Sequence, residues 1–136
     1  MTAMSDYLED ALINHVLRNT TLTSPTTVYM ALFTASTGLE ANSPSAEVSG
    51  GSYERKVAAF DAPSGGATSN TSEIAFTQAT ASWGTVTDAA IVDHLSNTTW
   101  GTDVNVLFHG TLTASKVVDS GDTFKFAAGD VDVTLA

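Results

Sequence analysis

The spacing of apolar residues changes once along this chain, from a helical to a strand period, and no other feature limits the fold as strongly. Apolar side chains recur at helical spacing over residues 6–18, on a face formed by Leu8, Leu12 and Val16. Ser5 is a suitable N-cap, and Pro25 ends any continuation because proline disfavours the helical conformation before it. The pattern predicts one amphipathic helix that packs on the rest of the fold.

After Pro25 the apolar period falls to two, which is typical of strands. Residues 27–33 are apolar on both faces and predict a central, buried strand. Further candidates are 53–60, exposed at its start, 73–77, 83–93, a buried strand at 104–112, and a terminal pair at 123–127 and 131–135. We expect this pair to be joined by the turn at 128–130, and Phe124 and Phe126 to share one face.

One helix followed by six or seven short strands predicts a mainly β fold. The expected architecture is an antiparallel β-sandwich or partly closed barrel, with the N-terminal helix covering an open edge or end. Residues 1–136 are expected to form a single domain. Residues 36–52 are rich in Gly, Ser and Glu and predict a long surface loop, and residues 95–103 predict a second polar loop.

The charge balance excludes two classes of partner. With 5 Lys and Arg against 15 Asp and Glu, the formal net charge is −10, the wrong sign for binding nucleic acid or an anionic membrane. We expect neither a signal peptide nor a membrane span, since the chain shows no basic-then-apolar leader and no long apolar run. The chain has no cysteine, which rules out disulfides and zinc-thiolate sites.

Catalytic and metal-binding patterns are weak throughout the sequence. The spacing of the three histidines indicates no metal site: His15, His94 and His109. No G-x-S-x-G motif frames a nucleophile. Asp130 and Asp132 are interpreted as solvated, and so is the acidic turn at 119–122, with calcium at that turn as a minor alternative. We therefore expect no catalytic residue, no metal and no cofactor.

Aromatic side chains offer the remaining binding signal. Four of them could stack on sugar rings, although core packing is the commoner role: Tyr29, Tyr53, Trp83 and Trp100. Trp100 lies in the polar stretch 96–103 and is the one expected to be exposed. Trp100, Tyr53 and Glu47 are the candidate contacts to a partner or a glycan.

Several motifs together resemble a family of small tailed-phage virion proteins that are commonly labelled tail fibre proteins. The similar segments are residues 6–19 (DYLEDALINHVLRN), 24–34 (SPTTVYMALFT), 47–53 (EVSGGSY) with Arg55, 62–66 (APSGG), 79–85 (ATASWGT), 108–112 (FHGTL), 120–124 (SGDTF) and 128–129 (AG). The chain departs from the pattern at residues 88–103, where Asp88, Asp93 and His94 intervene in a usually more apolar stretch. That departure puts the pairing of this strand in question.

The resemblance implies a non-enzymatic component of a tailed-phage virion, assembled in the host cytoplasm. We expect an accessory module that forms a homo-oligomer, a trimer or a ring, because a surface rich in uncharged Ser and Thr is easily buried between copies. It would dock on a capsid or tail protein, as a fibre base, decoration or adaptor. The alternative is the receptor- or glycan-binding head of a tail fibre, which binds a host-surface glycan.

Overall fold

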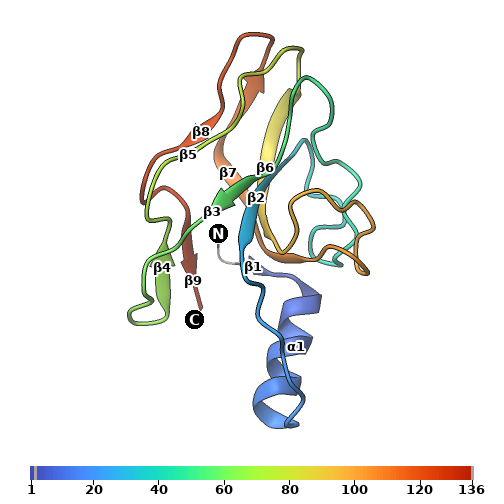
Figure 1. The fold of residues 1–136 in the computed structure, drawn as a ribbon, viewed down its shortest axis with the longest axis vertical. Helices are drawn as coiled ribbons and strands as arrows, with labels where there is room; N and C mark the ends of the chain where they lie inside the picture. The colour runs from blue at the N-terminus through green and yellow to red at the C-terminus, as the bar shows by residue number, and fades with distance from the viewer. Residues whose placement is uncertain (2, 136) are drawn as a thin grey trace.

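The computed structural model describes residues 1 and 3–135, and within them the chain forms one α-helix and nine β-strands (Figure 1). The elements are β1 (Ala3–Met4), α1 (Asp6–Leu17), β2 (Val28–Phe33), β3 (Lys56–Ala58), β4 (Ala67–Ser69), β5 (Ile74–Ala75), β6 (Gly84–Val92), β7 (Val106–Val118), β8 (Lys125–Phe126) and β9 (Asp132–Thr134). Every strand pair is antiparallel. The expected mainly β class with an N-terminal helix is confirmed, and the architecture is that of a sandwich.

The largest sheet, called the main sheet below, has the strand order β1-β7-β6-β2-β3. β2 lies between β6 and β3, and its residues Met30, Ala31, Leu32 and Phe33 are all 0% exposed. The two-faced apolar pattern of this segment therefore marks a central strand, as predicted. Because consecutive strand residues point to opposite faces, both faces of the main sheet need an apolar cover.

Two short ribbons, β4–β9 and β5–β8, cover one face of the main sheet, at the left of Figure 1. The core between these layers includes Met30 and Leu32 of β2, Ile74 of β5 and Val133 of β9. Phe124 and Phe126 make an edge-on ring contact at 5.2 Å beside it, which agrees with the expectation that they share a face.

The predicted pairing of 123–127 with 131–135 is wrong. β8 pairs with β5, with Phe126 opposite Ile74, and β9 pairs with β4, with Val133 opposite Thr68. The reason is the buried side chain of Asn70, which donates to the Ala127 carbonyl at 2.9 Å and accepts from the Val131 amide at 2.8 Å. The segment between β8 and β9 thus wraps around Asn70, and each strand pairs with an earlier one.

Loops rather than regular structure cover the second face of the main sheet. The 36–52 loop and the 95–103 loop lie side by side there, at the right of Figure 1. With the residues that flank them, they enclose a second core cluster: Ala31, Phe33, Leu39, Ala90, Val92, Val104 and Val106, with Tyr29 and Trp100 packed against it. The 36–52 loop is therefore a packed layer: Leu39, at 0% exposed, lies in this second cluster, and Val48, at 4% exposed, reaches the core on the ribbon side.

α1 projects from the body of the molecule, so the expectation that it covers an edge or end of the sheet is wrong (Figure 1). None of its residues is buried; Leu8 packs partly against the core and Leu12 is half-buried, but Val16 is 72% exposed. The Ser5 amide donates to the Leu107 carbonyl at 3.1 Å and fixes where the helix leaves the sheet. Since ribbons and loops already cover both faces of the main sheet, α1 has only its first turns in contact with it.

Four further strands differ from expectation. β7 extends to Val118, six residues beyond the predicted end, and its outer half is mostly exposed. β1 and β4 were not predicted, because two or three residues carry too little periodicity. β3 is shorter than 53–60, and Arg55 just before it is buried although the start of this strand was expected to be exposed.

Asp88 does not disrupt the pairing of β6, despite its position in the stretch that departs from the family pattern. The residue is 4% exposed and lies at a register shift between β6 and β7. Its carboxylate accepts hydroxyl hydrogen bonds from Thr87 at 2.6 Å and Thr111 at 2.9 Å. These two bonds replace the solvation that burial removes, so a β-bulge accommodates the charge.

The first prediction compares two apolar residues of α1. Leu8→Ala should lower the free energy of unfolding by about 1–2 kcal/mol, because it removes apolar contacts with the core. Val16→Ser should change it by less than about 0.5 kcal/mol, because that side chain is already in water. Urea unfolding followed by circular dichroism measures both, and an equal loss in the two variants would contradict the observed placement of the helix.

Candidate functional site

Arg55 forms a buried ion pair that holds the 36–52 loop. Its Nε donates to Oε1 of Glu47 and its Nη2 donates to Oε2, both at 2.7 Å. Arg55 is 4% exposed and Glu47 is 17% exposed, so the pair is largely removed from water. The two parallel bonds match the planar fork of the guanidinium to the carboxylate and fix both side chains in one orientation.

The same guanidinium also holds the neighbouring loop. Nη1 of Arg55 donates to the backbone carbonyls of His94 at 2.8 Å and Asn97 at 3.0 Å. The guanidinium carbon lies 4.9 Å from the ring centroid of Trp100, in cation–π geometry. One side chain therefore connects the 36–52 and 95–103 loops, and we call Arg55, Glu47, Tyr53 and Trp100 the Arg55 cluster.

Tyr53 connects the Arg55 cluster to the main sheet. Its hydroxyl accepts a hydrogen bond from the Leu32 amide at 2.9 Å and donates one to Glu47 at 3.1 Å. Burial and the nearby Glu47 carboxylate raise the pKa of Tyr53 far above its usual value. Its ring packs edge-on against Trp83 at 5.4 Å. The hydroxyl thus stays protonated and links β2 to the loop layer.

All three candidate contacts, Trp100, Tyr53 and Glu47, meet in the Arg55 cluster. Trp100 is half-buried, so the expectation that it is exposed is wrong. Its ring packs on Phe33 at 6.2 Å, and the Arg55 guanidinium lies over it, so the ring contacts the protein itself. Arg55 itself was not predicted as a site residue, although its position in the similar motif and the scarcity of cations in the chain were available signals.

A second polar network fixes the inner ends of the same loops. The Asn42 carboxamide donates to Asn105 at 2.8 Å and accepts from the Val106 amide at 2.7 Å. Asn105 in turn donates to the Asp93 carboxylate through its backbone and its side chain, at 2.6 and 2.8 Å. The loops are therefore anchored at two places. Between the two loops lies a hollow of about 340 Å³, which we call the loop hollow, lined by Glu47, Ser49, Tyr53, Leu95, Ser96 and Thr98.

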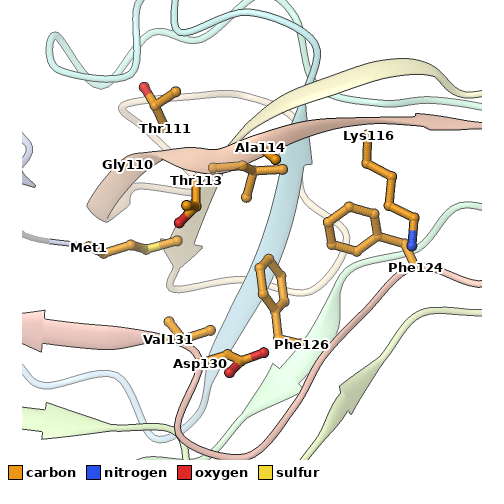
Figure 2. Close-up of a pocket in the computed structure, with 11 residues that line it drawn as sticks. Met1, Gly110, Thr111, Thr113, Ala114, Lys116, Phe124, Phe126, Asp130 and Val131 are labelled. Carbon is orange, nitrogen blue, oxygen red and sulfur yellow. The ribbon is translucent and has the colours of Figure 1, made fainter.

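A larger hollow of about 420 Å³ lies elsewhere, between the outer half of β7 and the segment from β8 to β9 (Figure 2). The Lys116 ammonium is 5.6 Å from the Phe124 ring centroid, and Phe126 and Asp130 also line the hollow. An aromatic ring beside polar groups of both charges is suited to a sugar or another small polar ligand. No sequence motif pointed to this place.

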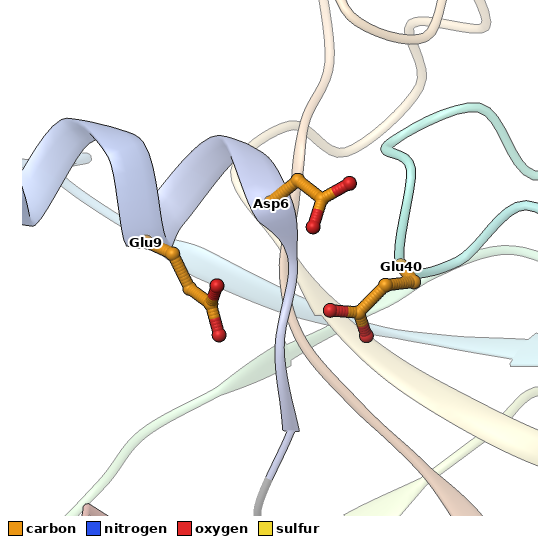
Figure 3. A group of neighbouring side chains, drawn as sticks. All are labelled: Asp6, Glu9 and Glu40. Atoms are coloured by element: carbon orange, nitrogen blue, oxygen red, sulfur yellow. The ribbon is translucent and has the colours of Figure 1, made fainter.

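Acidic groups gather where α1 meets the 36–52 loop (Figure 3). Carboxylate oxygens of Asp6, Glu9 and Glu40 lie within 4.8 Å of one another, and all three residues are exposed. Glu40 also pairs with Nε2 of His109 at 2.7 Å. Hard cations such as Ca²⁺ bind oxygen ligands of this type. Because the three side chains are exposed, water can solvate their carboxylates equally well.

The acidic and histidine residues singled out from the sequence have local structural contacts. In the turn at 119–122, Asp122 accepts from the Asp119 amide at 2.9 Å. Asp130 accepts from the Ala127 amide at 3.1 Å. The three histidines lie on different elements and contact different partners: His15 the Thr20 carbonyl, His94 the amides of Ser96 and Asn97, and His109 Glu40.

Comparison with protein families decides the class of the protein. Residues 3–134 match the family model described as Podophage GP4 fiber I protein gp80. The chain belongs to this family. The resemblance to phage fibre proteins is thereby confirmed, and the protein is a structural component of a phage virion. No curated protein matches the chain, and no helix in the described residues is long and apolar enough to cross a membrane.

The second prediction compares two neighbouring cations. Arg55→Lys should lower the free energy of unfolding by about 2–4 kcal/mol, because lysine keeps the charge but cannot form the fork with Glu47 or reach both carbonyls. Lys56→Ala, which removes an exposed pair with Glu54, should cost at most about 1 kcal/mol. Chemical denaturation measures both values. Equal costs would show that the Arg55 cluster does not hold the loops.

The third prediction concerns alkaline pH. Because the pKa of Tyr53 is raised in the folded state, the unfolded chain loses this proton first, near its ordinary pKa of about 10. Stability is therefore unaffected by this group below pH 10 and falls above it, by about 1.4 kcal/mol per pH unit. Tyr53→Phe should show a shallower fall between pH 10 and 11.5 when unfolding is measured by urea titration. An identical slope in the variant would contradict a Tyr53 hydroxyl that stays protonated.

Proposed function

We propose that the protein is a non-enzymatic accessory module, a fibre base, decoration or adaptor, that docks on a capsid or tail protein through the face built by the 36–52 and 95–103 loops. The observation that supports this role is the Arg55 cluster, in which one guanidinium joins both loops to the main sheet. A loop pair held in this way presents a surface of constant shape. Binding then requires little ordering of the loops, which lowers its entropic cost.

The buried charges support a structural rather than a catalytic role. Arg55 is satisfied by Glu47 and two carbonyls, and Asp88 by two hydroxyls, so both are fully engaged in holding loops and strands. A general base or nucleophile has to reach a substrate, and these groups do not. A non-enzymatic role also agrees with membership of a fibre protein family.

The net charge indicates what kind of surface would receive the module. With a charge of −10 per copy, close approach to a basic capsid or tail surface is electrostatically favoured, and its rate depends on ionic strength. We propose that residues 1–136 act as one domain that also contacts other copies of itself. Assembly would take place in the host cytoplasm, where virion proteins of this kind are made.

A second candidate function is the receptor- or glycan-binding head of a fibre. The observation that favours it is the hollow in Figure 2, with Lys116, Phe126 and Asp130 around it, and not Trp100, whose ring contacts Arg55. In this case the bound partner would be a host-surface glycan. The two candidates use different faces of the molecule and can be separated by substitution.

The fourth prediction tests docking through the loops. Ser49→Lys with Thr98→Lys changes two exposed positions on the rim of the loop hollow, and Thr71→Lys with Ser72→Lys is the matched control on exposed positions before β5. Both double variants should unfold like the natural protein. The amount of protein in purified particles should fall several-fold for the loop variant and stay unchanged for the control.

Equal incorporation of both double variants at low and high salt would contradict the proposed docking face. Retention of the purified protein on host polysaccharide, lost in Phe126→Ala, would favour the glycan-binding head instead. Hydrolysis of that polysaccharide would contradict the non-enzymatic role.

A further inference from the structure

The distal half of α1 carries an apolar surface that the described residues, 1 and 3–135, leave largely exposed. Ile13, Val16 and Leu17 are 54%, 72% and 77% exposed, and their spacing places them on one side of the helix. The segment after α1 returns along another side, where the Leu22 amide donates to Nδ1 of His15 at 3.3 Å. We call Ile13, Val16 and Leu17 the helix tip.

An apolar hollow of about 330 Å³ opens at one end of the sandwich, between the main sheet and the β4–β9 ribbon. Its lining includes Val28, Phe60, Ile91, Leu107, Val133 and Leu135. None of the described residues that line it is ionisable, and Leu135 is 46% exposed. We call this hollow the end groove.

We propose that the helix tip of one copy inserts into the end groove of a second copy. This inference depends on the proposed function in one respect, that copies of the protein meet in the virion. It adds the two surfaces through which they would bind one another. The tip cannot fill the groove of its own chain, because hydrogen bonds at Ser5 and Asp6 fix the base of α1 and the helix points away from the body (Figure 1). Joining two different surfaces gives a head-to-tail contact, which forms a ring if the rotation between copies closes.

The charge distribution favours a second copy in this groove. Residues 11–17 contain no Asp, Glu, Lys or Arg, and the groove lining contains none, so the contact removes no formal charge from water despite the net charge of −10. Arg18 follows the tip directly. Asp61 and Asp132 line a neighbouring hollow, which shares Ala67 and Thr68 with the end groove. These two carboxylates beside the groove could pair with Arg18 of the inserted helix.

Pairing of two helices is disfavoured by the same distribution. Glu9 and Asp10 lie on the same side of α1 as the helix tip, and Asp6 begins that side. Parallel pairing would place these acids against their counterparts. In antiparallel pairing they would face the apolar tip of the partner helix. The end groove offers the tip an apolar partner without these contacts.

The contact is small, and its strength should depend on how many copies are arrayed together. Three side chains bury much less than the roughly 800 Å² per partner of a standard stable interface. Association in dilute solution should therefore be weak. Copies held close together on a particle or in a closed ring experience a much higher effective concentration, which makes a weak contact sufficient.

Cysteine crosslinking tests the inference directly, since the natural chain has no cysteine. Leu17→Cys in the helix tip is mixed with Leu135→Cys at the rim of the end groove, and the mixture is oxidised under mild conditions. We expect a heterodisulfide between the two variants, several-fold above the yield from Leu17→Cys mixed with Ser120→Cys, an exposed position in the distant 119–122 turn. Adding Ile13→Asp to the Leu17→Cys chain should reduce the heterodisulfide to the control yield.

Three outcomes would overturn the inference. One is a disulfide yield between Leu17→Cys and Leu135→Cys that equals the yield with the Ser120→Cys control. Another is a dominant disulfide between two Leu17→Cys chains, which would indicate helix pairing. The third is a control-level crosslink together with loss of Ile13→Asp from particles, which would assign the tip to a different virion protein. The crosslink is measured on purified protein, whereas the loop variants are measured by their incorporation into particles. Failure of the proposed docking face would therefore not affect the outcome of the crosslinking test.

Discussion

β2 cannot leave either of its faces in contact with water, and this requirement organises the rest of the chain. Four consecutive residues of β2 are fully buried, so the main sheet has to be covered twice. One cover is a second β layer made of short ribbons, as in other sandwiches. The other cover is made of loops, which have no ladder of hydrogen bonds to hold them and need side chains to do so.

The Arg55 cluster meets that need in a way that apolar contacts could not. Loop backbones that lie over a core expose carbonyls that require donors, and the guanidinium supplies several donors from one point. Burying an arginine is unfavourable unless its charge is paired, and Glu47 provides the pair. The cost of desolvating these groups is thus offset by fixing two long loops in one arrangement.

Local periodicity was enough to predict the class of the fold and several elements. The start and end of α1, the central β2 and most of β6 follow from residues next to one another in the sequence. Pairing was harder, because the partners of β8 and β9 depend on Asn70, a single polar side chain about 60 residues earlier. The exposure of Trp100 was misjudged because its neighbours are polar, whereas its packing is determined by Phe33 and Arg55.

The ribbons also determine when the fold can be completed. β4 and β5 pair with β9 and β8, the last strands in chain order, so both ribbons are pairings between distant parts of the sequence. Chains rich in such contacts fold slowly, since a long loop must close before any contact forms. While a ribosome is still extending the chain, Met30, Leu32 and Ile91 face solvent. A chain that stops before β8 therefore lacks both ribbon pairings and leaves this face of the main sheet in contact with water.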